Sequence, residues 1–217
     1  MRQLVWKDFY INRAQLITQV AIMAFLTMLS LVWKQSGAVN FLVPLMFTYS
    51  SMLVPFLALN SATQEEKNRT LAFLRSLPMD ADTIVASKFV TPLLAGLAWA
   101  GVSALVAHVV APVTGESVVS LEAPLLLVCA TLPIAALELV MFFKFNANAA
   151  RTAMMITLFS AYLVPVAVPG LGKKLIPILS MAVSPGPAMI ALVVAAALFV
   201  YFAGMVIAQA IFRRREV

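Results

Sequence analysis

The sequence predicts an all-α integral membrane protein with about six transmembrane helices, and three observations support this fold class. Hydrophobic residues make up 63% of the 217 residues and charged residues only 11%, with a mean hydropathy of +0.99. Soluble domains are nearer half apolar and a quarter charged. Apolar stretches of about 20 residues, the length of a membrane-spanning helix, recur along the chain. Because these stretches occupy nearly the whole sequence, we expect one transmembrane domain over residues 1–217.

The distribution of basic residues predicts the orientation. With the N-terminus inside and six crossings, 12 of the 15 basic residues fall in cytoplasmic segments, and only Lys34, Lys173 and Lys174 fall outside. Short cytoplasmic loops carry the excess of Lys and Arg, so both termini are expected in the cytoplasm. We interpret the basic excess as a signal of topology and of contact with membrane lipids, not as a nucleic-acid-binding surface.

The elements follow in order along the chain. Residues 1–13 mix charged and aromatic side chains at helical spacing, which predicts an interfacial helix before the first span. The spans themselves are expected at about residues 14–33, 40–60, 84–111, 121–143, 150–168 and 187–212. Between the last two spans, segment 169–187 contains an apolar run too short to cross the bilayer. This run predicts a re-entrant or interfacial piece on the outer side.

The cytoplasmic loop at residues 61–81 is the longest polar stretch of the chain. Thr63 followed three residues later by Glu66 fits a capping box, which predicts that a helix begins there. Glu65 and Arg69 are spaced four apart with the acid first, an orientation that supports a helix. The loop therefore predicts a short charged helix under the membrane. It either connects two spans as a solvated segment or fits into a groove on a soluble partner.

This region also resembles a known family. Residues 66–88, with Ser76-Leu77-Pro78 and then Ile84-Val85-Ala86-Ser87-Lys88 leading into the third span, are similar to the first cytoplasmic loop of type-2 ABC-exporter permeases. That family has six spans, an N-terminal interfacial helix, a coupling helix between spans two and three, and a re-entrant element before span six. Each has a predicted counterpart here. The resemblance implies a bacterial plasma-membrane exporter subunit that moves an amphipathic peptide, toxin, antibiotic or lipid-like substrate outward by alternating access.

The resemblance further implies two kinds of partner, namely a second permease (an identical or a paired one) and separate ABC ATPase subunits. The sequence has no Gly-x-x-x-x-Gly-Lys-Ser/Thr phosphate loop, so we expect ATP and Mg to bind to the partner ATPase. By itself the chain is then neither an enzyme nor the holder of a cofactor. The residues implied in ATPase coupling are Glu65, Glu66, Arg69, Leu71, Phe73, Leu74 and Arg75.

Two predicted spans carry polar patches. The patch in span two consists of Thr48, Tyr49, Ser50 and Ser51, and that in span five of Thr157, Ser160 and Tyr162. Such side chains commonly form hydrogen bonds within or between helices. The resemblance implies a second role, because spans two and five of this class line the pathway between paired permeases. Small residues at Gly96-x-x-x-Ala100 and Gly204-x-x-x-Ala208 would permit close helix packing.

Glu138 is the one acidic residue in the interior of a predicted span, away from its ends. A charge in the bilayer is costly, so Glu138 is a candidate gating residue, although it could also snorkel, pair with a base or stay protonated. His108 stands alone, and we expect no metal site. Two alternatives to an ABC permease stay open: an autonomous channel or proton-coupled transporter that uses Glu138, and a membrane immunity or assembly factor.

Overall fold

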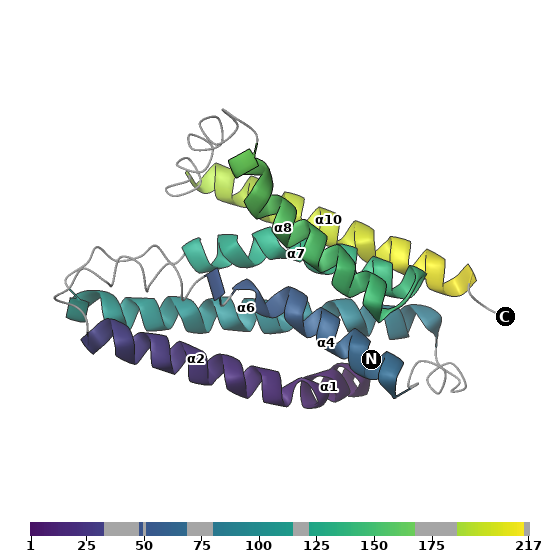
Figure 1. Cartoon of the computed structure of the whole chain (residues 1–217), viewed down its shortest axis with the longest axis horizontal. Coiled ribbons are helices and arrows are strands. Elements are labelled where there is room, and N and C mark those ends of the chain that lie inside the picture. Colours follow the sequence, from purple (N-terminus) through teal and green to yellow (C-terminus); the bar gives the residue numbers. More distant parts are fainter. Residues whose placement is uncertain (33–47, 50, 69–79, 115–121, 168–185, 215–217) are drawn as a thin grey trace.

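The computed structural model describes residues 1–32, 48–49, 51–68, 80–114, 122–167 and 186–214. The regular secondary structure of these residues is entirely helical. In chain order the helices are α1 (Arg2–Ile11), α2 (Arg13–Val32), α4 (Leu53–Lys67), α6 (Ala81–Thr114), α7 (Glu122–Lys144), α8 (Ala147–Ala167) and α10 (Pro187–Arg214). They form an elongated bundle in which α7, α8 and α10 lie on one side and α2 and α6 on the other (Figure 1).

Four of the described helices are long and apolar enough to cross a membrane, namely α2, α7, α10 and the part of α6 from Ala81 to Val106. They coincide with the predicted spans one, three, four and six. Of the predicted second span, the structure describes only residues 48–49 and 51–60, which include the first part of α4. The predicted fifth span coincides with α8. Neither α4 nor α8 is among the four helices that are long and apolar enough to cross a membrane. The chain is thus a multi-pass membrane protein, and its division into six spans stays a prediction.

Helix α7 is the centre of the bundle and packs against α10, α8, α4 and α6. Its buried face includes Val128, Leu132, Ala135 and Leu139, which recur at intervals of three or four residues. Residues at this spacing lie on one side of a helix, so they form a continuous apolar stripe. Charged residues also mark the two ends of α7. Glu122 lies in its first turn and Lys144 in its last turn, and each has the sign that complements the helix dipole at that end.

Small residues allow two close helix contacts with the core. A Cβ placed on Gly204 of α10 would lie 3.0 Å from the Cβ of Ala136 on α7, and Ala208 one turn later is fully buried. A Cβ on Gly96 of α6 would lie 2.4 Å from a methyl group of Val54 on α4. Both positions that were predicted to permit close packing therefore do so, and larger residues would force the helices apart.

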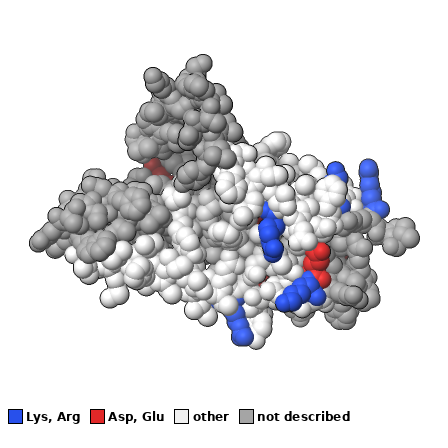
Figure 2. All heavy atoms as spheres, in the orientation of Figure 1, with Lys and Arg blue, Asp and Glu red and all other residues white. Residues whose placement is uncertain are grey.

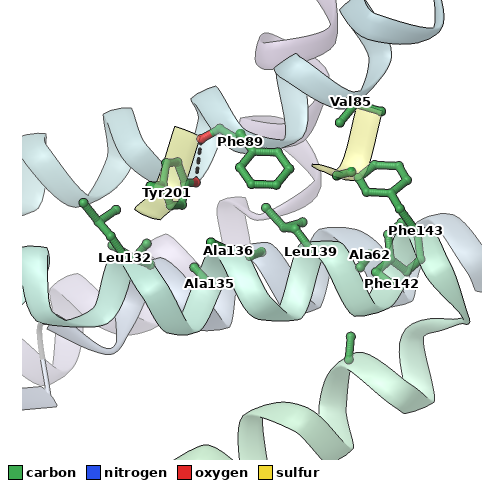
Figure 3. Packing of buried hydrophobic residues seen from close by; sticks show 14 of the residues in the cluster. Ala62, Val85, Phe89, Leu132, Ala135, Ala136, Leu139, Phe142, Phe143 and Tyr201 are labelled. Atoms are coloured by element: carbon green, nitrogen blue, oxygen red, sulfur yellow. Dashed lines mark hydrogen bonds between the residues drawn. The ribbon is translucent and has the colours of Figure 1, made fainter. Parts of the chain in front are cut away.

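Tyr201 of α10 joins the core to α6. Its ring is fully buried and meets Phe89 edge-on, with the ring centroids 5.3 Å apart. Its hydroxyl donates a hydrogen bond of 2.7 Å to the backbone carbonyl of Phe89 (Figure 3). A buried hydroxyl in an apolar bundle needs such a partner, because no water is at hand to replace it.

Three predicted features of the polar segments have different outcomes. The N-terminal helix is present as α1, over residues 2–11. The helix start at Thr63 is wrong, because α4 runs through this position without interruption and the Thr63 hydroxyl donates to the carbonyl of Leu59 instead. Buried Leu57, Ala58 and Ala62 keep this stretch packed against the bundle, so the helix continues. The rest of loop 61–81, from residue 69 to 79, and nearly all of segment 169–187 lie outside the described residues.

The N-terminus and the C-terminal end of α10 lie toward the same end of the bundle, at the right of Figure 1. On the face shown in Figure 2, the Lys and Arg side chains also gather over the right half. We call this the charged end; α1, the C-terminal ends of α4 and α10, and the N-terminal ends of α6 and α8 meet there.

Candidate functional site

A buried ammonium group lies at the charged end, where α1, α4 and α6 meet. The side chain of Lys88 on α6 is only 2% exposed. Its Nζ atom lies 2.6 Å from Oδ1 of Asp8 on α1 and 2.6 Å from Oε1 of Glu65 on α4. It also donates to the hydroxyl oxygen of Ser61, at 2.9 Å. The ammonium therefore donates hydrogen bonds to Asp8 and Ser61 and forms an ion pair with Glu65.

Lys7 completes this group from the more exposed side. Its Nζ lies 2.5 Å from Oε1 of Glu65 and 3.7 Å from Oδ1 of Asp8, with the side chain 29% exposed. We call Lys7, Asp8, Ser61, Glu65 and Lys88 the polar cluster. Two acids and two bases balance in charge, which is the arrangement that makes a buried ion pair tolerable. Asp8 Oδ2 and Glu65 Oε2 accept no hydrogen bond from the residues that the structure describes.

The protonation of Asp8 depends on its neighbours. Burial raises the pKa of the Asp8 carboxyl, because the ionised form loses contact with water. The Lys88 ammonium opposes this shift through its charge and its hydrogen bond. Lys88 is thus the main group that favours an ionised Asp8, with a smaller contribution from Lys7, and loss of Lys88 would raise the pKa of Asp8 further.

Two asparagines extend the contact between α1 and α4. Asn12, which follows α1, donates from its amide to the backbone carbonyl of Asp8 at 2.9 Å. Asn60 on α4 donates in turn to the side-chain oxygen of Asn12 at 2.7 Å. Both bonds run beside the polar cluster, so α1 is held to α4 by ionic and neutral contacts together.

Two further polar contacts connect the same region to α8 and α10. Glu66 on α4 accepts a hydrogen bond of 2.5 Å from the backbone N–H of Ala147, the first residue of α8. A carboxylate suits this place because the first N–H groups of a helix have no partner within the helix. Asp82, in the first turn of α6, pairs with Arg213 in the last turn of α10, with Nε 2.7 Å from Oδ1 and the second guanidinium nitrogen bonded to Oδ2.

These contacts have a common geometry around segment 69–79. The segment leaves α4 just after Glu65 and Glu66 and enters α6 just before Asp82 and Lys88. The flank before it, at the end of α4, is therefore bonded to α6, α1 and α8. The flank after it, at the start of α6, is bonded to α4, α1 and α10. The two flanks and the helices bonded to them thus comprise five helices, joined by polar contacts within about two turns of the ends of the segment.

The predicted ATPase-coupling residues are thus divided. Glu65 and Glu66 belong to the end of α4, where Glu65 is 1% exposed and faces the polar cluster. The exposed side chains at the end of α4 are Glu66, Lys67 and Asn68, and that of Glu66 accepts the bond from α8. The other predicted coupling residues, Arg69, Leu71, Phe73, Leu74 and Arg75, lie outside the described residues.

The predicted pathway residues that the structure describes form bonds inside the chain. Ser51 donates to the carbonyl of Thr48 at 2.8 Å, and its own carbonyl accepts from Thr131 of α7 at 3.0 Å. The carbonyl of Tyr49 accepts from Gln19 of α2 at 3.3 Å. In α8, Thr157 bonds back to its own helix. Ser160 is exposed, whereas Ser50 and the side chain of Tyr162 are outside the described part.

Glu138 lies on the buried side of α7. It is 1% exposed, and neither carboxyl oxygen has a hydrogen-bond partner among the described residues. Of the outcomes weighed for this residue, snorkelling to the aqueous interface does not occur. His108 is exposed on α6. The described residues hold no group of three His, Cys, Asp or Glu side chains that could bind a metal ion.

Sequence reasoning missed Asp8 as part of a site and used Lys88 as a topology signal and as part of the motif that resembles the family, not as a member of an ion pair. Two signals could have found them. Lys88 stands inside the predicted third span, and Asp8 is the one acidic residue among the first 64. A base within a span requires a compensating acid, and Asp8 was an available candidate.

Comparison with known proteins agrees with this architecture. Residues 3–213 match the model of the family described as ABC-2 family transporter protein. A comparison with curated proteins finds no match. The family match covers nearly the whole chain, from α1 to the end of α10. The chain therefore belongs to the ABC-2 family of transporter proteins and is a membrane permease subunit of an ABC transporter.

Proposed function

We propose that this permease exports an amphipathic substrate outward by alternating access, powered by ATPase subunits that dock on segment 69–79 at the charged end. One observation carries the proposal: the two flanks of this segment are bonded to α1, α6, α8 and α10. A segment that only connected two spans would not need a buried ion pair between its two flanks, since a buried pair is costly to desolvate. As a docking segment it would pass a movement of the ATPase directly to the bundle.

The proposed complex contains two permeases, identical or paired, and two ATPase subunits, with the charged end facing the cytoplasm. ATP and Mg bind to the ATPase subunits in this scheme. The apolar faces of the bundle meet lipid and the second permease. An amphipathic substrate fits a transporter whose walls are almost entirely apolar, with hydroxyl groups such as those of Thr157 and Ser160 as its few polar contacts.

Reversal of charge in segment 69–79 tests the docking part of the proposal. In the double variant Arg69→Glu and Arg75→Glu, the ATPase that co-purifies with the unaltered chain should be lost, because mismatched charges across an interface cost several kcal/mol. Arg151→Glu is the matched control, since Arg151 is exposed on α8 outside the segment. Insertion into the membrane should be normal in both. Full retention of the ATPase by the double variant would contradict docking at this segment.

A further inference from the structure

A groove of about 900 Å³ lies between α1 and the first half of α6, beside the polar cluster. One wall is formed by residues of α1 and the residue before it, namely Met1, Arg2, Gln3, Val5, Trp6 and Phe9. Val90 and Leu94 of α6 form the other wall. The volume is within the range of sites that bind small molecules. No residue of the polar cluster lines it.

The lining of the groove combines apolar walls with one basic side chain. Arg2 is the one ionisable side chain among its described lining residues, and it is exposed. The lining has no carboxylate that would neutralise the Arg2 guanidinium. The groove thus has a hydrophobic body and a positively charged rim, which is complementary to an amphiphile with an anionic head.

The position of the groove along the bundle suits a membrane lipid, with the basic rim at the level of the headgroups and the apolar body at the level of the acyl chains. Val90 and Leu94 follow the buried ammonium of Lys88 by two and six residues, or roughly 3 and 9 Å along the helix axis. The groove therefore begins at the charged end and extends into the apolar part of the bundle. Trp6, with 73% of its surface exposed, is the kind of residue that lies at the boundary between headgroups and acyl chains.

The apolar wall continues along α6 beyond the groove. Leu94, Leu97 and Leu105 lie on one side of this helix and are 48%, 44% and 67% exposed. An acyl chain that enters the groove can follow this exposed strip toward the bilayer centre. A bound polypeptide would instead place backbone polar groups against an apolar strip that offers no hydrogen bonds.

We propose that this groove binds one anionic phospholipid of the leaflet next to α1. Its phosphate headgroup contacts Arg2, and an acyl chain lies against Trp6, Phe9 and Leu94. The bound lipid fills the space between α1 and α6. It thereby holds the N-terminal helix against the helix that carries Lys88. This site is independent of ATPase docking and of the exported substrate.

Quenching of Trp6 fluorescence by brominated lipids tests the proposal. The full chain is reconstituted into phosphatidylcholine vesicles that contain a small fraction of either dibrominated phosphatidylglycerol or dibrominated phosphatidylcholine. The same measurement on Trp6→Phe is subtracted, which isolates the signal of Trp6 from those of Trp33 and Trp99. We expect the anionic lipid to quench Trp6 at about fivefold lower mole fraction, the factor given by ~1 kcal/mol per basic residue near a lipid headgroup.

Two variants separate a built site from general attraction to a charged surface. Arg2→Gln should abolish the preference for the anionic lipid. Arg13→Gln should keep it, because Arg13 packs over the Tyr10 ring, 4.3 Å from its centroid, and does not line the groove. Equal quenching by the two lipids in the unaltered chain would overturn the proposal. So would a preference that survives Arg2→Gln, or one that is lost equally in Arg13→Gln.

Discussion

The Nζ atom of Lys88 lies 2.6 Å from Oε1 of Glu65, and this ion pair joins the start of α6 to the end of α4. The eleven residues numbered 69–79 thus leave and re-enter the described structure on either side of one buried contact. The same ammonium binds Asp8, so α1 moves with the pair. A displacement that separated α4 from α6 would have to break charge-assisted bonds in a nearly dry environment, where they are strong. The two helices are therefore expected to respond to the segment as one unit.

The first prediction concerns the stability of the polar cluster. Lys88→Met should destabilise the permease by roughly 3–5 kcal/mol, because Asp8 and Glu65 lose their buried counter-charge. The triple variant Asp8→Asn, Glu65→Gln and Lys88→Met should recover most of this loss, since the charge then left in the cluster is that of Lys7, whose side chain is 29% exposed and reaches water. Unfolding by dodecyl sulfate in mixed micelles, followed by circular dichroism, measures both.

Lys67→Met is the control for this experiment. Lys67 is exposed at the end of α4 and takes part in none of the contacts of the polar cluster. Its replacement should leave the unfolding midpoint unchanged. Equal effects of Lys67→Met and Lys88→Met would show that the ion pairs of the cluster contribute nothing specific.

The second prediction uses the ion pair between Asp82 and Arg213. Asp82→Arg should lower the stimulation of the co-purifying ATPase by the permease, because α6 and α10 then repel each other beside segment 69–79. The reversed pair, Asp82→Arg with Arg213→Asp, should restore it. Stability should change little in either variant, since both side chains are well exposed and water screens the pair.

Arg214→Asp serves as the matched control for that pair. Arg214 is the exposed neighbour of Arg213 in the last turn of α10. Together with Asp82→Arg it should not restore the stimulation. If Arg214→Asp restored the stimulation as well as Arg213→Asp does, overall charge and not the specific pair would decide the result.

Part of this architecture could be predicted from the sequence, and the reason is local. The ends of α2, α7 and α10 lie within about two residues of the predicted spans, because each is marked by a change from apolar to polar side chains. The polar cluster could not be predicted in this way, since Asp8 and Lys88 are 80 residues apart in the chain. The capping box at Thr63 failed for a related reason. Burial of Ala62 and Glu65 against the bundle keeps α4 continuous, and no local motif reports such packing.

The third prediction concerns orientation. Single cysteines at Ser36 and Glu116 should react with a membrane-impermeant thiol reagent in intact cells, whereas those at Asn68 and Asn148 should react only after permeabilisation. The background chain carries Cys129→Ala, which removes the native, buried thiol. Labelling at position 68 in intact cells would place the charged end outside and contradict the proposed side of ATPase docking.

The fourth prediction separates an ATP-driven permease from a proton-coupled transporter or channel. Glu138 is a buried acid with no hydrogen-bond partner in the described part of the chain, and a proton pathway through the bundle would use it. We expect vesicles that contain the chain alone to hold a pH gradient as well as empty vesicles do. Glu138→Gln should leave stimulation of the ATPase intact. If the pH gradient collapsed rapidly in vesicles that contain the unaltered chain, and more slowly in vesicles with Glu138→Gln, a proton-coupled transporter or channel would be favoured.

The central claim is that the polar cluster transmits ATPase movement to the bundle, and ATP turnover by the reconstituted complex measures this most directly. The test protein is the triple variant Asp8→Asn, Glu65→Gln and Lys88→Met, which keeps segment 69–79 unchanged. We predict that it binds the co-purifying ATPase as tightly as the unaltered permease does, yet fails to stimulate ATP hydrolysis. Normal binding with full stimulation would contradict the account, because the ionic contacts beside the docking segment would then carry no coupling.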